Sequence, residues 1–329
     1  MILNFVLLVL SFVALVKGAD FFVLGAASIG RRMKISPLII GLTIVSIGTS
    51  TPELAVSLVA SIKGQNGIAV GNVVGSNLFN ILVVLGASAL VTPLFIKREL
   101  LVKDFPFMLV CTLALCLFCT DIWIDSYKLD GNKIIPQQFV LSRSEGAVLL
   151  IFLGIFFYYL IKDALSNPQE QQGLSEENKI DSKPLYLTIF FTIFGIGLII
   201  LGGNLAVSCA TKIARFFKIS EEVIGLTICA IGTSLPELVT SVVAAKRGEN
   251  EIAIGNVVGS NIFNLLFILG LSVVISPIVL TTPVVIDLLI LLAVCLISYL
   301  ILLKGRMGRL AGGLFLLIYM GYMAYLFLR

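Results

Sequence analysis

Long apolar runs follow one another along almost the whole chain, separated by short polar stretches. A membrane-spanning helix needs roughly 20 apolar residues, and ten runs are long enough: 2–28, 37–62, 68–91, 100–120, 145–162, 185–211, 221–245, 251–275, 282–303 and 309–328. The first run has no charge before Lys17 and continues past Asp20, so we expect a retained helix rather than a signal peptide. The pattern predicts an all-α, multi-pass membrane protein with about ten transmembrane helices.

The pattern also repeats at a spacing of 184 residues. The segment from Gly41 to Gly86 aligns without gaps to the segment from Gly225 to Gly270, and 30 of the 46 positions are identical. Each half contains five predicted spans, and because five is odd the second half enters the membrane from the opposite side. Such inverted repeats are common in secondary transporters, which bind their substrate near the midplane between the halves. We therefore expect a first transmembrane repeat over residues 1–163, a polar linker over 164–184 and a second repeat over 185–329.

Composition agrees with a membrane location. Only 13% of the residues are charged and 58% are hydrophobic, whereas a soluble domain carries about 25% charged residues. The net charge of +4 gives no indication of nucleic-acid binding. Lys and Arg concentrate on the cytoplasmic side of membrane proteins. That rule favours a cell-membrane protein with both termini outside and the linker inside, because most basic residues then lie inside: Arg31, Arg32, Lys34, Lys97, Arg98, Lys103, Lys162, Lys179, Lys183, Lys246, Arg247, Lys304, Arg306 and Arg309.

The candidate chemistry lies in the most similar part of the two repeats, which share the pattern Ile-Gly-Thr-Ser-x-Pro-Glu-Leu. Proline lacks an N–H, and its ring clashes with the carbonyl four residues earlier. Pro52 and Pro236 therefore predict helix breaks over Gly-Thr-Ser in the middle of two apolar spans. Freed carbonyl groups are tolerated at membrane depth only where they line a cavity or bind something.

Glu53 and Glu237 directly follow these prolines, and no Lys, Arg or His in either repeat core provides a counter-ion. A charge at the bilayer centre costs at least about 2.5–3.5 kcal/mol, so such residues are usually functional. A cation or a proton must supply the missing charge. The chain has no His, the commonest proton relay near neutral pH, and its six cysteines show no metal-ligand spacing.

Oxygen-bearing side chains accompany both glutamates. Helical spacing places Thr49, Glu53 and Ser57 on one face, with Ser50 beside them, and the second repeat duplicates this set as Thr233, Glu237, Ser241 and Ser234. The next span of each repeat carries a stripe of polar residues at intervals of four, namely Asn72, Ser76 and Asn80, or Asn256, Ser260 and Asn264. Such hard oxygen donors suit Ca²⁺ or Na⁺, and Mg²⁺ gives up its water too reluctantly. Two carboxylates balance one Ca²⁺ or two Na⁺, so the two ions would compete. No cofactor is expected.

Structural roles compete with these assignments for single residues. Ser57 and Ser241 are residue types that often bond carbonyls of their own helix, and Asn72 and Asn256 are equally consistent with interhelical hydrogen bonds. Asp20 and its counterpart Asn204 lie in the first helix of each half, where a polar interface contact and interfacial solvation are both open. Duplication of the whole glutamate-centred pattern is what favours function.

The motifs GTSTPEL and GNVVGSNLFN, with their copies GTSLPEL and GNVVGSNIFN, closely resemble the two alpha repeats of the Ca²⁺/cation antiporter superfamily, specifically its prokaryotic-type Na⁺/Ca²⁺ exchangers. The resemblance implies ten spans, outside termini and a first and sixth helix that slide as a gate. It also implies ligand roles: Glu53 and Glu237 shared by Ca²⁺ and Na⁺, Thr49 and Thr233 through carbonyls and side chains, Ser50, Ser76, Ser234 and Ser260 for flanking Na⁺, Asn80 and Asn264 at the centre, and the carbonyls of Ser46 and Ala230. Amides rather than Asp at 80 and 264 argue against K⁺ coupling.

The expected function is therefore secondary active antiport of Na⁺ against Ca²⁺ by alternating access. The main alternative is H⁺/Ca²⁺ or another cation antiport, in which one glutamate is protonated instead of binding Na⁺. A cation channel is less consistent with inverted repeats and broken helices. An intramembrane enzyme lacks a His or Cys beside the acids. We expect Ca²⁺, Na⁺ and the lipid bilayer as the partners, with no nucleic acid and no obligatory protein partner.

Overall fold

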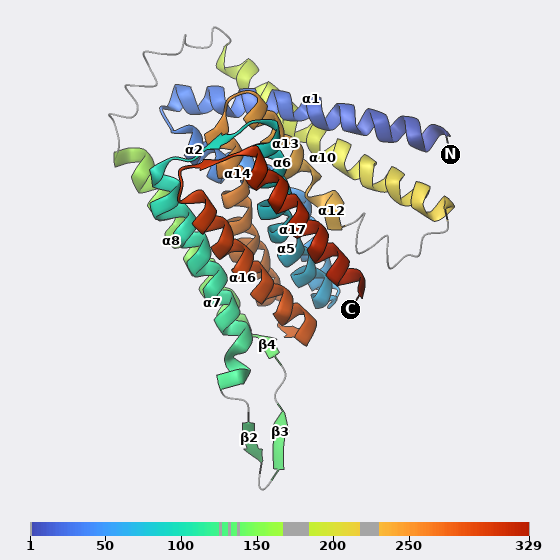
Figure 1. Cartoon of the computed structure of the whole chain (residues 1–329), viewed down its shortest axis with the longest axis vertical. Helices are drawn as coiled ribbons and strands as arrows, with labels where there is room; N and C mark the ends of the chain where they lie inside the picture. Colours follow the sequence, from blue (N-terminus) through green and yellow to red (C-terminus); the bar gives the residue numbers. More distant parts are fainter. Residues whose placement is uncertain are drawn as a thin grey trace.

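The computed structural model describes residues 2–124, 127–130, 133–136, 139–166, 184–217 and 230–328, and they are helical almost throughout (Figure 1). The first half contains α1 (Ile2–Met33), α2 (Pro37–Ile40), η1 (Gly41–Val45), α3 (Ser46–Thr49), α4 (Thr51–Ile62), α5 (Asn66–Phe79), η2 (Asn80–Val84), α6 (Leu85–Val91), η3 (Leu100–Asp104), α7 (Phe105–Ile124) and α8 (Arg143–Ser166), where η marks a π-helical turn. The second half contains α10 (Leu185–Phe216), α12 (Ala230–Thr233), α13 (Leu235–Lys246), α14 (Asn250–Phe263), η5 (Asn264–Leu269), α15 (Gly270–Ile275), α16 (Thr282–Leu302) and α17 (Arg309–Leu328).

The element boundaries repeat at the spacing of the sequence repeat. Helices α5 and α14 both have 14 residues and begin at the equivalent residues Asn66 and Asn250. The turn before each of them contains a glycine with positive φ, Gly64 at 71° and Gly248 at 82°, a conformation that favours glycine. The two inverted five-helix repeats predicted from the sequence are confirmed.

The predicted membrane spans are found wherever the chain is described. Eight described helices are long and apolar enough to cross a membrane, and Pro37–Thr49 with Thr51–Ile62, bent by 50°, makes a ninth. The tenth, predicted over 221–245, begins among residues outside the described ranges, and its described part is α12 and α13. The predicted linker also lies largely outside them, over 167–183.

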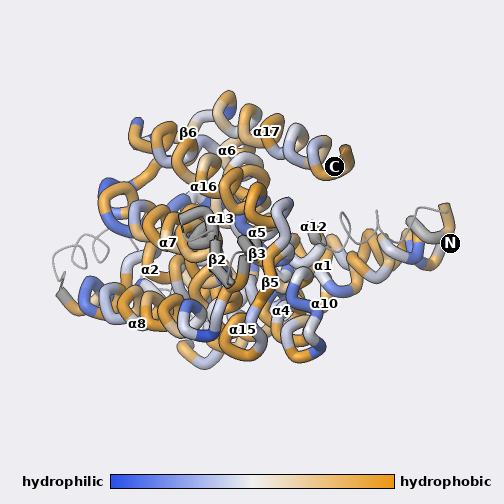
Figure 2. Tube along the Cα trace, turned by 90° about the horizontal axis from the view of Figure 1, so that it is seen from below, coloured by the Kyte–Doolittle hydropathy of each residue, from blue (hydrophilic) through white to orange (hydrophobic). Residues whose placement is uncertain are grey.

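Several ionisable and amide side chains are buried in this molecule, while many large apolar side chains are exposed. Fully buried residues include Glu53, Glu237, Asn80 and Asn264, whereas Leu310 on α17 is 94% exposed. Hydrophobic residues make up most of the length of the helices (Figure 2), and many large ones are exposed, such as Leu3, Ile62 and Leu165. A protein surrounded by water would expose its charged side chains and bury most of its large apolar ones. The opposite arrangement here indicates that lipid surrounds the bundle.

The helix that follows the broken helix in each repeat, α5 or α14, lies at the centre of the bundle. In the apolar windows of the spans Asn66–Val91 and Asn250–Ile275, 72% and 78% of the residues are buried, against 22% for Arg143–Leu165 and 11% for Arg309–Leu328. Helices α5 and α14 are therefore enclosed, and α8 and α17 form the rim.

Helices α1 and α10, each of 32 residues, run side by side, steeply inclined to the bundle (Figure 1). Their backbones approach closely because glycines face the partner helix: a Cβ on Gly18 would lie 2.9 Å from the carbonyl oxygen of Gly195, and one on Gly202 would lie 2.9 Å from that of Ser11. This pair touches the bundle through α2, α3, α12 and α13. The first helices of the two halves thus form one packed unit against the broken helices.

Short strands, which the sequence did not predict, connect some helix ends. Strand β1 (Leu94–Phe95) pairs with β6 (Arg306–Met307), and β4 (Phe139–Leu141) pairs with β5 (Ile278–Leu280), so both pairs join the two halves. A hairpin of β2 (Tyr127–Asp130) and β3 (Lys133–Pro136) follows α7. Strands of two to four residues are too short to show the alternation from which strands are recognised.

Candidate cation-binding site

Both predicted helix breaks are present, and each places a glutamate at the start of a new helix. Ser50 leaves the helical conformation at φ −82° and ψ 9°, and Ser234 does so at φ −92° and ψ 6°. Pro52 and Pro236 occupy the first turns of α4 and α13, where a missing N–H costs nothing. Glu53 and Glu237 lie in the same turns. The positive end of the helix dipole there stabilises a carboxylate.

Each carboxylate is bound by the serine of the opposite repeat. Ser50 Oγ donates a hydrogen bond of 2.8 Å to Glu237 Oε1, and Ser234 Oγ donates one of 2.8 Å to Glu53 Oε1. Ser76 Oγ lies 3.0 Å from Ser234 Oγ and 3.5 Å from Glu53 Oε1. The two breaks therefore form a single site in which each half completes the other.

Asn72 and Asn256 connect each broken helix to the next helix of its own repeat. The Nδ2 atom of Asn72 donates to Ser57 Oγ at 2.9 Å and to the main-chain oxygen of Glu53 at 3.2 Å. Asn256 Nδ2 does the same with Ser241 Oγ at 2.9 Å and the Glu237 oxygen at 3.5 Å. Ser57 and Ser241 thus accept interhelical bonds, and both asparagines take the interhelical role that the sequence left open.

The threonines before the breaks reach across to these asparagines. Thr49 Oγ1 donates to Asn256 Oδ1 at 3.1 Å, and Thr233 Oγ1 donates to Asn72 Oδ1 at 3.4 Å. Thr49 Oγ1 also lies 3.1 Å from the Val45 carbonyl oxygen. The two repeats are linked by a second pair of crossed hydrogen bonds, just outside the crossed serines.

Four asparagines meet where α5 and α14 end. Asn80 and Asn264 each begin a π-helical turn, a feature often found at functional sites. Asn80 Nδ2 donates to Asn261 Oδ1 at 3.4 Å, and Asn264 Nδ2 donates to Asn77 Oδ1 at 3.0 Å. The chain segments that carry the glutamates pack here too, since α4 contacts η5 and α13 contacts η2. The predicted amide ligands are therefore bound across the interface between the repeats.

Several buried oxygen atoms of the site have no hydrogen-bond partner in the described part of the chain: Glu53 Oε2, Glu237 Oε2, Asn80 Oδ1, Asn264 Oδ1 and Ser260 Oγ. Neither glutamate forms an ion pair with a described Lys or Arg. Buried acceptors without donors are costly, and a desolvated Ca²⁺ or Na⁺ is what such a set of oxygen atoms can bind. No three His, Cys, Asp or Glu side chains converge among the described residues, so a cation here would depend on hydroxyl and amide oxygens as well as the two carboxylates.

Two of the predicted ligands were expected to act through main-chain carbonyls. The Ser46 carbonyl oxygen accepts a bond of 3.0 Å from the Ser50 N–H, and the Ser46 hydroxyl donates to the Leu42 carbonyl at 2.8 Å. Ala230 is the first residue of α12, and its side chain lies outside the described set. Their part in ion binding stays a prediction.

The sequence also left some contacts unrecognised. Asn77 and Asn261 belong to the duplicated Gly-Ser-Asn motif but were assigned no role, although duplication itself was a signal. Asp20, for which an interface contact was left open, accepts hydrogen bonds of 2.7 and 3.0 Å from Arg247 at the end of α13. This ion pair attaches α1 to the bundle.

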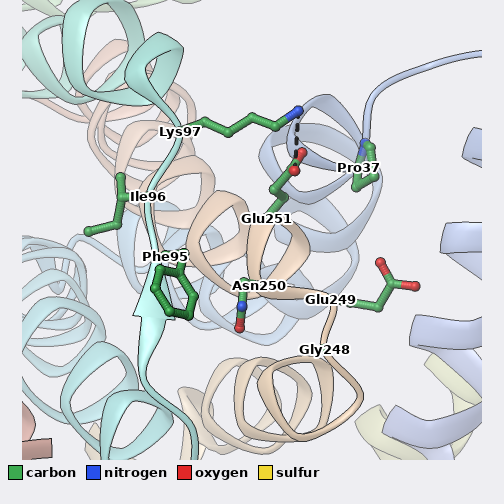
Figure 3. A pocket seen from close by; sticks show the side chains of 8 residues that line it. All are labelled: Pro37, Phe95, Ile96, Lys97, Gly248, Glu249, Asn250 and Glu251. Carbon is green, nitrogen blue, oxygen red and sulfur yellow. Dashed lines mark ion pairs between the residues drawn. The ribbon is translucent and has the colours of Figure 1, made fainter. Parts of the chain in front are cut away.

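A surface pocket of about 250 Å³ lies away from the paired glutamates, at the turn between α13 and α14 (Figure 3). Lys97 and Glu251 form an ion pair of 3.2 Å at its wall, and Glu249, also lining it, pairs with Arg31 at 3.5 Å. Its carboxylates therefore already have cationic partners, unlike those of the buried site. The remaining lining residues are Pro37, Phe95, Ile96, Gly248 and Asn250.

Comparison with known proteins extends over both halves. The family model described as sodium/calcium exchanger protein matches residues 3–162 and 187–328. The chain is 39% identical over 283 residues to the inner membrane protein YrbG of Escherichia coli, covering 84% of this chain and 81% of that protein. It is 34% identical to the sodium/calcium exchanger MaX1 of Methanosarcina acetivorans over 84% of each chain. A solved structure of the sodium-calcium exchanger NCX_Mj superposes with a TM-score of 0.82 at 32% identity, over 98% of both chains.

Proposed function

The chain belongs to the sodium/calcium exchanger protein family, and we propose that its two helix breaks form the one site through which the ions it exchanges must pass. The protein is a secondary active antiporter that exchanges Na⁺ for Ca²⁺ across the membrane. Glu53 and Glu237 are the central ligands in this proposal. They are completed by the predicted oxygen donors Thr49, Thr233, Ser50, Ser234, Ser76, Ser260, Asn80, Asn264, Ser46 and Ala230.

The crossed serine–glutamate hydrogen bonds are the observation that supports this site most directly. Ser50 with Glu237 and Ser234 with Glu53 have the same length, 2.8 Å, and each joins opposite repeats. A ligand set shared by both repeats persists only while the halves are in register. Movement of one half against the other would therefore change access to the ions and their coordination together, as alternating access requires.

Charge explains why the two ions exclude each other. Two buried carboxylates are neutralised by one Ca²⁺ or by two Na⁺, and either alternative leaves a net charge near zero in a medium where uncompensated charge is costly. Occupation by Na⁺ thus removes the electrostatic reason for Ca²⁺ to bind. Competition at a site that faces one side at a time gives exchange rather than cotransport.

The protein is a multi-pass helical membrane protein, which supports a location of the proposed site within the membrane. We further propose that both termini face outside and that the residues joining the halves face the cytoplasm, since this orientation puts most Lys and Arg inside. A cysteine introduced at the C-terminal end of α17, beyond Leu328, should react with an impermeant thiol reagent in intact cells. Labelling only after permeabilisation would show that the C-terminus faces the cytoplasm, which is the opposite orientation.

Transport by the purified chain in lipid vesicles tests the proposal and the need for any partner protein. Vesicles loaded with Na⁺ and diluted into Na⁺-free buffer with radioactive Ca²⁺ should accumulate Ca²⁺, and equal Na⁺ on both sides should abolish accumulation. An imposed pH gradient without a Na⁺ gradient should drive none. Uptake that follows the pH gradient and ignores Na⁺ would establish the H⁺/Ca²⁺ alternative, and Ca²⁺ entry without any counter-ion would indicate a channel.

A further inference from the structure

Hydrogen bonds within the buried asparagine cluster fix the orientation of two amide groups. Asn80 and Asn264 are proposed ligands, and each uses its amide nitrogen to bond a second asparagine of the opposite repeat: Asn261 Oδ1 accepts from Asn80, and Asn77 Oδ1 accepts from Asn264. The oxygen atoms of both ligands have no partner in the described part of the chain. The amide planes are thus held with nitrogen toward the partner asparagine and oxygen away from it.

An asparagine side chain carries an acceptor oxygen and a donor NH₂ group that differ little in size. Packing alone therefore does not choose between the two orientations, whereas a cation strongly prefers the oxygen. Some acceptor must bind the NH₂ group to keep it out of the site. Asn77 and Asn261 are the side chains that provide this acceptor, and both are 1% exposed.

We propose, on the premise that the central oxygens bind the transported ions as described above, that Asn77 and Asn261 are positioning residues that turn the amide oxygens of Asn264 and Asn80 toward the cations. They touch neither ion. They act across the repeat interface, so each repeat determines the orientation of the other's ligand, as the crossed serines do for the glutamates.

The two positioning residues are not anchored equally. Asn77 Nδ2 donates to the main-chain oxygen of Asn261 at 3.3 Å, which fixes Asn77 with its own oxygen toward Asn264. Asn261 Nδ2 has no hydrogen-bond partner among the described residues. Replacing that nitrogen by oxygen at position 261 therefore removes no hydrogen bond and leaves an acceptor for Asn80.

This difference separates the proposal from a purely structural role. N261L removes the acceptor while keeping the branched shape and the number of heavy atoms, and N261D keeps an acceptor but introduces a carboxylate. Structural packing would tolerate the buried leucine better than a buried carboxylate. If Asn261 positions the Asn80 oxygen, the order for ion affinity is the reverse: N261D should bind Ca²⁺ more tightly than N261L.

The experiment measures Na⁺-driven Ca²⁺ uptake by the full chain in vesicles, as KM for Ca²⁺ and as maximal rate. N77L and N261L should raise the KM about tenfold and change the maximal rate less than twofold, whereas N261D should keep the KM within threefold of wild type or lower it. The control N66A removes a half-buried amide bridge between the halves, from Asn66 Nδ2 to Ser276 Oγ and the Pro277 oxygen. It should leave the KM unchanged.

Unchanged KM values in N77L and N261L, in a chain whose wild type exchanges the two ions, would overturn this inference alone. Absence of exchange in the wild type would instead overturn the proposed function. If leucine prevents folding, N77S and N261S replace it, because the serine hydroxyl is too short to reach the partner amide. Ca²⁺ should then raise the thermal unfolding midpoint of these variants less than that of wild type, and an equal rise would count against positioning.

Discussion

The two repeats make matching contacts at the centre of the bundle and different contacts at the turns that lead to it. At the centre, Ser50–Glu237 and Ser234–Glu53 are both 2.8 Å. At the turn between α13 and α14, three ion pairs attach the second repeat to the first half: Arg247–Asp20, Glu249–Arg31 and Glu251–Lys97. The corresponding turn between α4 and α5 has Lys63, Gln65 and Gly67 at the equivalent positions, so it has no carboxylates to offer.

The difference reflects what each region must do. In the proposed mechanism the central ligands serve ions that arrive from either side, so the same contacts suit both repeats. Each turn faces only one side of the membrane, and nothing requires the two to match. The comparison shows that the crossed serine–glutamate contacts at the centre match in the two repeats, whereas the ion pairs at the turns do not.

The largest expected effect concerns the two glutamates. E53Q and E237Q each remove one of the two negative charges, and we expect each to lower Na⁺-driven Ca²⁺ uptake at least ~100-fold, since loss of one member of a buried charged group costs about 3–5 kcal/mol. The symmetric centre predicts equal losses. E249Q is the control, because it removes a carboxylate from the turn.

Vesicle uptake of radioactive Ca²⁺ per amount of folded protein measures these variants. More than a tenth of wild-type flux in either glutamine variant, or a tenfold difference between the two, would contradict a shared central site.

The next effect tests the close packing between the centre and the first broken helix. A Cβ on Gly259 of α14 would lie 2.6 Å from the carbonyl oxygen of Leu42 and 2.8 Å from Ser46 Oγ. G259A should therefore destabilise the purified protein by about 1–3 kcal/mol through overpacking, measured as a lower thermal unfolding midpoint. Gly154 on the exposed face of α8 has no neighbour within 4 Å among the described residues, and G154A should leave the midpoint unchanged or raise it. Equal effects of the two substitutions would refute this close packing.

The crossed serines provide a third effect, comparable in size to that of G259A. S50A and S234A each remove a hydrogen bond to a carboxylate, worth about 1.5–3 kcal/mol, and we expect the KM for Ca²⁺ to rise by about 10- to 150-fold in both. T51L is a matched control that gives the first repeat the residue found at the equivalent Leu235. Thr51 is exposed, and within the described part of the chain its hydroxyl bonds only the Ile47 carbonyl, at 3.1 Å, so the KM of T51L should equal that of wild type. A threefold or larger difference between the two alanine variants would break the symmetry of the centre.

The smallest effect concerns the ion pairs at the turn. Partly exposed pairs are worth about 0.2–1 kcal/mol, and a double-mutant cycle of D20N with R247Q should give a coupling energy in that range that falls with added salt. The equivalent residues Asn204 and Lys63 should show no coupling in N204A with K63Q. Unfolding midpoints of the purified variants provide the measurement, and matching coupling in the two cycles would show that the turns are not different after all.

The sequence by itself determined the number and placement of the spans, the inverted repeat, the two helix breaks and the two glutamates. These follow from local rules: the length of an apolar run, the missing N–H of Pro52 and Pro236, and the cost of a buried charge without a counter-ion. Duplication in the chain made them visible without any knowledge of contacts. The sequence also indicated the polar stripes that contain Asn80 and Asn264.

Only the tertiary structure decided which groups meet. Ser50 binds the glutamate of the opposite repeat, Asn77 binds the NH₂ group of Asn264, and Asp20 binds Arg247, although each pair is separated by more than half the chain. The π-helical turns at Asn80 and Asn264 likewise carry no local sequence signal. These features depend on which sides of the helices pack against each other when lipid covers the remaining apolar surfaces. The packing of the two halves together sets that arrangement.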